Sequence, residues 1–184
     1  MLAIDVSTSM LAEDLKPNRL EAAKDVAAEF INGRPNDNIG ITLFAGETFT
    51  QCPLTVDHAV LLDMIHNIKC GLITDGTAVG MGIANAVTRL KDSKAKSKVI
   101  ILLTDGTNNK GDISPMTAAE IAKSFGIRVY TIGVGTNGMA PYPYPVGNTV
   151  QYVSMPVEID EKTLTEIAGT TDGNYFRATS NSKL

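Results

Sequence analysis

The apolar run VIILL at residues 99–103 is the feature that most limits the folds open to this chain. Five consecutive apolar positions predict a strand buried on both faces, which is typical of a parallel sheet covered by helices. Two further β-branched runs, at 38–46 and 127–135, predict strands of the same kind, and 173–178 predicts a last strand. The chain therefore needs helices to cover both faces of its sheet.

Amphipathic helical patterns lie between the predicted strands. Asn18 is a suitable N-cap for a helix, Glu21 follows three positions later, and Gly33 marks the end of that helix. Similar signals predict further helices over 57–71, 77–90, 114–126 and 160–169. Strands that alternate with helices predict a doubly wound α/β fold, with a mainly parallel sheet and helices on both faces.

Length and charge favour a single domain. The chain has 184 residues, of which 43% are hydrophobic and 20% charged, with a net charge of −4. The Lys-rich stretch at 91–98 is too short to indicate a nucleic-acid partner, and the longest apolar run is too short to cross a membrane. These properties are typical of a globular protein-binding domain or enzyme.

Two features of the chain leave alternatives open. Cys52 and Cys70 lack metal-binding spacing, and they are either two free thiols or a disulfide formed in an oxidising compartment. Only four residues precede Asp5, whereas a central strand usually has about five or six. We therefore expect the chain to be a piece of a longer protein.

Residues 136–156 differ in composition from the rest of the chain. This segment, TNGMAPYPYPVGNTVQYVSMP, holds four prolines and three tyrosines, and Gly147-Asn148 predicts a turn between two extended arms. We predict a hairpin-like insertion at the edge of the sheet where the strands end. Tyrosines on a proline-stiffened hairpin suit protein recognition, and packing onto the sheet edge is the alternative.

Oxygen side chains gather at the predicted strand ends. In MLAIDVSTSML, Asp5 ends the first strand, and Ser7 and Ser9 follow at two-residue spacing, so an extended backbone directs all three to one side. Thr77 opens a predicted helix in TDGTAVG, and Asp105 ends the buried strand in LLTDG. Open α/β sheets bind ligands beyond the carboxyl ends of their strands, so we expect these three loops to meet there.

Three hydroxyls and two carboxylates suit a hard divalent cation. Mg²⁺ prefers oxygen ligands in octahedral geometry and keeps several waters, and Mn²⁺ or Ca²⁺ are alternatives. The predicted metal ligands are Asp5, Ser7, Ser9, Thr77 and Asp105. A Glu or Asp carboxylate of a partner protein is then a natural further ligand. Singly, each residue also has a simpler role: Thr77 can cap its helix, and Asp105 can turn the chain.

These residues resemble the metal-ion-dependent adhesion site of the von Willebrand factor A domain family. The family signature is D-x-S-x-S on the first loop, Thr on the second and Asp on the third, and it is matched here by Asp5, Ser7, Ser9, Thr77 and Asp105. The order of elements agrees over essentially the whole chain. The resemblance implies one domain over 1–184 with a Rossmann-like fold, no catalytic residues, and Mg²⁺-dependent binding of a protein partner.

Longer stretches resemble the aerotolerance-operon (Bat-type) bacterial membrane proteins, and the BatA group most closely. They include KPNRLEAAK, TQCPLTVDHAVL, RLKDSKAKSKVIILLTDGTNN and IDEKTLTEIA. The resemblance implies that the domain faces the periplasm and is anchored in the bacterial inner membrane by flanking helices absent from this chain.

Two other functions are alternatives. A Mg²⁺-dependent phosphatase or nucleotide hydrolase needs a nucleophile or base beside the metal, and no lysine or second carboxylate at close spacing supports Asp5 in that role. A structural domain with a vestigial metal site would use the 136–156 segment as its main contact surface.

Two motifs partly match known binding sites but do not fit them. GVGTNG at 133–138 matches G-x-G-x-x-G, but MAPYPYP follows it and cannot form the helix that dinucleotide binding requires. The stretch from Asp105 places Lys110 and Met116 where a calcium-binding EF-hand loop needs Gly and Glu.

Overall fold

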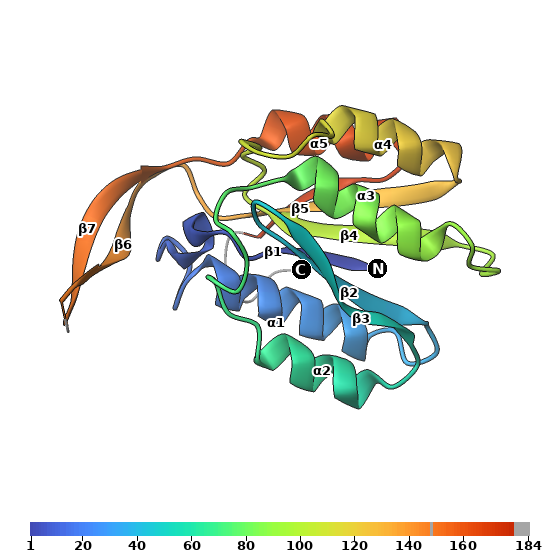
Figure 1. Ribbon diagram of the computed structural model, residues 1–184, viewed down its shortest axis with the longest axis horizontal. Helices are drawn as coiled ribbons and strands as arrows, with labels where there is room; N and C mark the ends of the chain where they lie inside the picture. Colours follow the sequence, from blue (N-terminus) through green and yellow to red (C-terminus); the bar gives the residue numbers. More distant parts are fainter. Residues whose placement is uncertain (148, 179–184) are drawn as a thin grey trace.

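A computed structural model describes residues 1–147 and 149–178 of the chain. Six strands form one sheet in the order β3-β2-β1-β4-β5-β8, in which β3 is antiparallel to β2 and the other neighbours are parallel (Figure 1). The strands are β1 (Leu2–Asp5), β2 (Ile39–Phe44), β3 (Thr48–Thr55), β4 (Lys98–Thr104), β5 (Ile127–Val134) and β8 (Tyr175–Ala178). The predicted α/β fold with a mainly parallel sheet is confirmed.

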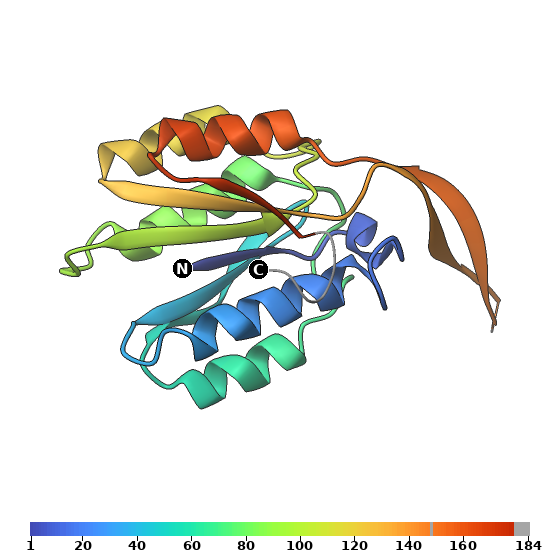
Figure 2. The same ribbon diagram turned by 180° about the vertical axis from the view of Figure 1, so that it is seen from behind.

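Helices cover both faces of this sheet (Figure 1 and Figure 2). One face carries α1 (Arg19–Asn32) and α2 (His58–His66), and the other carries α3 (Val79–Leu90), α4 (Pro115–Ser124) and α5 (Glu161–Thr170). Asn18 caps α1 as predicted, because its side-chain oxygen accepts the N–H of Glu21 at 2.9 Å. The start of α1 therefore follows directly from the sequence.

The VIILL run lies in β4, at the centre of the sheet. Ile101 and Leu103 pack on the side of α1 and α2, whereas Ile100 and Leu102 pack on the side of α3, α4 and α5. All four side chains are buried. Successive residues of a strand point to opposite faces, so a strand covered on both faces buries consecutive apolar side chains.

One strand and one helix end differ from the sequence prediction. The sequence did not predict β3, because an edge strand with Pro53 and several threonines lacks a continuous apolar run. The second helix was predicted to reach Gly71, but α2 ends at His66. The N–H of Asn67 still donates to the carbonyl of Asp63, but the next N–H, that of Ile68, donates to the carbonyl of Ile65 at 3.1 Å, so the last turn tightens and the helix ends there.

The strand order reverses direction at β1. After β1 the chain crosses through α1 to β2 on one side, and it later enters β4 on the other side. The carboxyl ends of β1 and β4 therefore form a topological switch point, the place where open α/β sheets bind ligands.

Two antiparallel strands, β6 (Gly138–Val146) and β7 (Thr149–Val157), form a separate hairpin that projects from this end of the sheet (Figure 1). Asn148, predicted to share the turn with Gly147, lies outside the described residues. Gly138 begins a strand and not a helix, so a dinucleotide site at 133–138 is excluded. None of the described helices is both long and apolar enough to cross a membrane.

Candidate metal centre

Asp5 lies at the end of β1, beside the last residue of β4. Ile4 pairs with Leu103 in the parallel register, which places Asp5 next to Thr104. Asp5 is fully buried, and its Oδ2 accepts a hydrogen bond from the Thr104 hydroxyl at 2.5 Å. Thr104 therefore holds the carboxylate on the β4 side.

The first loop turns into a short helix directly after Ser7. The sequence left open whether the backbone stays extended through Ser9, and the structure forms a 3₁₀ helix, η1 (Thr8–Leu11), in which the Ser7 carbonyl accepts the N–H of Met10 at 3.1 Å. This turn still brings the oxygens together: Ser7 Oγ donates to Asp5 Oδ1 at 2.6 Å and lies 3.0 Å from Ser9 Oγ. Three of the five predicted ligands form one hydrogen-bonded group.

Thr77 lies on the second loop, immediately before α3, and is buried. Its hydroxyl does not cap that helix, because the N-cap residue is Ala78 and has no side-chain cap. The side-chain oxygen of Asn109 accepts the N–H of Thr77 at 2.8 Å, and that of Asn108 accepts the N–H of Val79 at 2.9 Å. Because the third loop caps α3, the simpler role of Thr77 as a helix cap is excluded.

Asp75 joins the first and second loops. Its Oδ1 accepts the N–H of Thr8 at 3.0 Å, and its Oδ2 accepts the Thr8 hydroxyl at 2.8 Å. Its carbonyl accepts a hydrogen bond from Lys110 Nζ at 2.7 Å. The second loop is thus bonded to both of the others, and the three loops hold one another in place.

Asp105 follows β4 and is buried. Its Oδ1 accepts the N–H of Thr107 at 3.2 Å, so this residue does shape its own turn. Its Oδ2 accepts a hydrogen bond from Arg19 Nη1 at 3.1 Å. The carboxylate therefore has a positively charged neighbour that the sequence did not reveal.

Arg19 is a buried cation at the first position of α1, with 1% of its side chain exposed. Its Nε and Nη2 donate to the two carboxylate oxygens of Asp14, each at 2.8 Å, and Nη2 also donates to the carbonyl of Thr136 at 3.3 Å. Burial acts to raise the pKa of Asp14, but hydrogen bonds from Arg19 and from the N–H of Thr136 outweigh burial and hold that pKa below its usual value.

The two buried carboxylates are incompletely neutralised. Burial, followed by the negative charge of Asp105, raises the pKa of Asp5 to about 7, against the hydrogen bonds from Ser7 and Thr104. Arg19 supplies one positive charge, which it shares with Asp14. A divalent cation fits the remaining need for positive charge, and hydroxyl and carboxylate oxygens are the ligands that Mg²⁺ prefers.

Hydroxyl ligands are essential to this fit. Within residues 1–147 and 149–178, no group of three or more His, Cys, Asp and Glu side chains is placed to hold a metal ion. An ion at the switch point would therefore depend on serine and threonine oxygens as well as on the two aspartates.

Both cysteines are free thiols, which decides between the two alternatives left open by the sequence. Cys52 is buried in the core, and Cys70 Sγ donates to the carbonyl of Ser7 at 3.3 Å. Burial is the main cause that raises the pKa of Cys70, to about 12, so its thiol stays protonated and continues to donate to the first loop.

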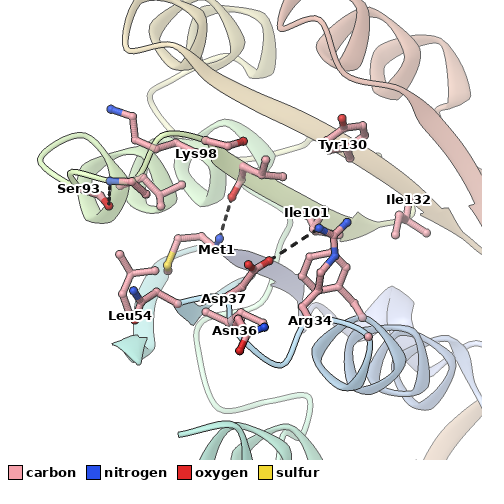
Figure 3. Close-up of a pocket in the computed structure, with 18 of the residues that line it drawn as sticks. Met1, Arg34, Asn36, Asp37, Leu54, Ser93, Lys98, Ile101, Tyr130 and Ile132 are labelled. Atoms are coloured by element: carbon pink, nitrogen blue, oxygen red, sulfur yellow. Dashed lines mark hydrogen bonds and ion pairs between the residues drawn. The ribbon is translucent and has the colours of Figure 1, made fainter. Parts of the chain in front are cut away.

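A cavity of about 710 Å³ lies at the opposite, amino end of the strands (Figure 3). Its walls include Met1, Ile101 and Tyr130, and the terminal amine of Met1 donates to the carbonyl of Val99 at 2.8 Å. None of the predicted metal ligands lines this cavity. The candidate site is the carboxyl edge of the strands, where Asp5, Ser7 and Ser9 are hydrogen-bonded to one another.

An open α/β sheet with buried carboxylates and hydroxyls at its switch point defines a class of domains that can present a cation at one edge. A family model described as the von Willebrand factor type A domain matches residues 1–184, and the chain belongs to this family. The family predicted from the D-x-S-x-S loop is therefore confirmed.

Solved structures of bacterial proteins share the fold. An aerotolerance-related membrane protein from Bacteroides fragilis is 35% identical, with a TM-score of 0.87 over 97% of this chain and 90% of that one. BatB from Bacteroides thetaiotaomicron is 34% identical, with a TM-score of 0.88 over 97% of this chain and 89% of that one. The resemblance to Bat-type proteins is confirmed, and BatB is among the named neighbours.

A more distant structure carries a metal. Proximal thread matrix protein 1 from the mussel byssus, with a zinc-occupied MIDAS motif, is 25% identical, with a TM-score of 0.73 over 100% of this chain and 41% of that one. MIDAS is the metal-ion-dependent adhesion site that the sequence resembles.

Curated relatives are longer than this chain. A UPF0353 protein from Nocardia farcinica is 33% identical over 202 residues, covering 100% of this chain and 59% of the relative. An uncharacterized protein from Borreliella burgdorferi is 30% identical over 178 residues, covering 96% of this chain and 52% of the relative. The chain thus spans little more than half the length of these relatives.

Proposed function

We propose that this domain binds a protein partner through a divalent cation held at the carboxyl ends of β1 and β4, with Mg²⁺ as the ion and Mn²⁺ or Ca²⁺ as alternatives. The observation that carries the proposal is the buried pair Asp5 and Asp105 beside the hydrogen-bonded hydroxyls of Ser7 and Ser9. Family membership and the mussel relative with zinc in its MIDAS motif support it.

The five proposed ligands have two kinds of role. Ser7, Ser9 and Thr77 offer neutral oxygens, and Asp5 and Asp105 supply negative charge, directly or through water. The Ser7 hydroxyl can keep its hydrogen bond to Asp5, because a hydroxyl oxygen has lone pairs left for a cation. An ion with two nearby carboxylates, one of them shared with Arg19, favours a further carboxylate, which a Glu or Asp of the partner would supply.

The rim of the proposed binding surface includes the hairpin. Tyr142 Oη donates to the carbonyl of Thr8 at 3.0 Å, and the N–H of Glu13 donates to the carbonyl of Pro141 at 2.9 Å. These bonds fix the base of the hairpin against the D-x-S-x-S loop. A partner that reaches the ion would therefore also contact β6.

We propose a binding role in preference to a hydrolytic one. A serine nucleophile needs a base, but within the described chain no hydrogen bond joins Ser7 to either histidine, and the Ser7 hydroxyl donates to Asp5 instead. His58 lies on α2 with its ring bonded to the carbonyl of Asp37 at 2.8 Å. A metal-dependent phosphatase or hydrolase and a structural domain with a vestigial site are the alternative functions.

The location proposed for the domain follows from its relatives. Solved structures that share the fold include a protein described as an aerotolerance-related membrane protein. We propose that this domain likewise belongs to a protein of the bacterial inner membrane and faces the periplasm, with its membrane segments outside this chain.

Titration calorimetry with Mg²⁺ and Mn²⁺ tests the metal site. We expect Asp5→Asn to weaken metal binding at least about tenfold, whereas Asp112→Asn, which changes an exposed carboxylate near the same edge, leaves it unchanged. Equal affinity in the wild-type protein and Asp5→Asn would rule out the proposed site. Metal-dependent turnover of a phosphate ester such as p-nitrophenyl phosphate, lost in Asp5→Asn, would instead favour the hydrolase.

A further inference from the structure

The β6 edge of the hairpin cannot accept another strand. Pro141, Pro143 and Pro145 occupy alternate positions of β6 within a continuous antiparallel ladder with β7. Proline has no N–H, so these positions are the non-hydrogen-bonded ones, and their main-chain groups point out of the hairpin. The carbonyl of Pro141 agrees with this assignment, because it accepts the N–H of Glu13 outside the hairpin. The outer side of β6 therefore lacks the donors that strand pairing requires.

The β7 edge has the opposite chemistry. Val150, Tyr152 and Ser154 stand opposite the three prolines, so their N–H and C=O groups also point out of the hairpin. In the described part of the chain, none of these three N–H groups makes a hydrogen bond. Every residue of β7 from Thr149 to Pro156 is exposed. Such a row of alternating donors and acceptors is a pairing edge for another strand.

The hairpin itself has no charged residue to protect this edge, and the nearby Glu13, which interacts with the Tyr152 side chain, is paired with Lys16 at 2.9 Å. Residues 136–156 contain no Asp, Glu, Lys, Arg or His. Charged side chains and prolines are the usual means by which edge strands avoid association. The prolines protect β6, whereas β7 presents Val150 and Tyr152, with 58% and 61% of their surfaces exposed.

We propose that β7 pairs with β7 of a second copy of this chain, antiparallel about a two-fold axis at Tyr152. In this arrangement Tyr152 faces Tyr152 of the partner subunit, and Val150 faces Ser154 of the partner subunit, with about six main-chain hydrogen bonds. An antiparallel strand edge is complementary to a second copy of itself, and the ribbon has no charged residue. Glu13, which interacts with Tyr152, carries its own counter-charge in Lys16.

The same arrangement stops at two copies. The new sheet has four strands, and each of its outer strands is a β6 whose edge lacks donors at 141–145. Because each hairpin has one open edge, pairing of hairpins gives a closed dimer and not a fibre. This inference does not depend on the metal site. A failure of the metal-binding proposal would leave the proposed dimer unaffected, and the reverse is also true.

Sedimentation across a concentration series tests the dimer, with EDTA present to exclude metal-mediated contacts. We expect a reversible monomer–dimer equilibrium for the wild-type chain. Tyr152→Pro removes the central outward N–H without removing a hydrogen bond of the hairpin, and Tyr152→Ala is the matched control that loses the side chain but keeps the N–H. The dissociation constant should rise at least about tenfold in Tyr152→Pro relative to Tyr152→Ala. A wild-type chain that stays monomeric at about 1 mM, or equal constants for the two variants, would overturn the proposal.

Amide hydrogen exchange gives a second readout. The N–H groups of Gln151 and Val153 point into the hairpin and should exchange slowly at every concentration. Those of Val150 and Ser154 should become slow only in the concentrated wild-type sample. Slow exchange of Gln151 and Val153 in Tyr152→Pro shows that the hairpin is intact. If the proline opens the hairpin, the test uses the wild-type protein alone. Amide exchange rates of Val150 and Ser154 that do not change with protein concentration would contradict the dimer.

Discussion

Arg19 and Asp105, 86 positions apart in the chain, form a buried ion pair at the carboxyl edge of the sheet, with Nη1 3.1 Å from Oδ2. The same guanidinium binds both carboxylate oxygens of Asp14. Arg19 therefore divides its charge between a proposed metal ligand and a carboxylate outside the metal site. We expect this division to set how strongly Asp105 attracts a cation.

Changes at Arg19 and Asp14 should move metal affinity in opposite directions. Arg19→Gln removes the positive charge beside Asp105 and should strengthen Mg²⁺ or Mn²⁺ binding about tenfold. Asp14→Asn leaves Asp105 as the remaining carboxylate bound to Arg19, and should weaken metal binding by a similar factor. Titration calorimetry measures both, and the double variant controls for loss of the pair. If both single variants weaken metal binding, Arg19 supports the structure of the site and does not set the charge of Asp105.

Acid should remove the stability that Asp14 contributes. The folded pKa of Asp14 lies below its usual value, so this contribution is fully present above the unfolded pKa of about 4 and is lost as pH falls through the folded pKa. Both side chains of the pair are buried, and Asp14→Asn should cost about 3 kcal/mol at pH 7. Urea unfolding should show that the difference between wild type and Asp14→Asn shrinks in acid; a difference that is constant from pH 7 to pH 3 would contradict this.

Gly135 allows Arg19 to approach the backbone closely. A Cβ at Gly135 would lie 2.5 Å from Arg19 Nε, and φ there is +135°. Gly138 has nearly the same φ, +133°, with no atom within 4 Å of a Cβ, so it is a matched control. Gly135→Ala should lower the free energy of unfolding by about 3 kcal/mol, clearly more than Gly138→Ala. Equal losses in denaturant titrations would mean that the backbone conformation alone matters.

Thr104 should influence metal binding without being a ligand. Thr104→Val removes the hydroxyl that donates to Asp5 Oδ2 and accepts the N–H of Gly106 at 3.0 Å. Thr131→Val is a control on the neighbouring strand, since that buried hydroxyl donates to the carbonyl of Leu164 at 2.8 Å. Both variants should lose about 1–3 kcal/mol of stability, but only Thr104→Val should change metal affinity. An unchanged affinity in Thr104→Val would show that Asp5 needs no support from β4.

The sequence predicted the parts of this domain that depend on local signals. Continuous apolar character identified β4, and Asn18 marked the start of α1, where its side chain accepts the N–H of Glu21. The order of strands and helices then placed the D-x-S-x-S loop and Asp105 at one edge. These inferences hold because capping and burial act over a few residues.

Contacts between distant segments could not be predicted in this way. In the sequence, Arg19 is an ordinary helix residue that follows an N-cap. No nearby residue indicates that it forms an ion pair with Asp105. Asn108 and Asn109 follow Asp105 directly, yet their partners lie on the second loop about 30 positions earlier. The sequence also could not decide the bend at η1, because polar residues after a strand fit both an extended and a turned backbone.

The hydrogen bonds from Thr8 to Asp75 and from Thr77 to Asn109 connect three crossovers that are remote in sequence. No one crossover can detach without breaking bonds to another, so the edge opens to solvent as a single cooperative unit. The conformational entropy of these segments is consequently lost during folding and not on ligand arrival. A ligand that docks on this edge meets a surface already set in shape, which favours rapid and reversible attachment.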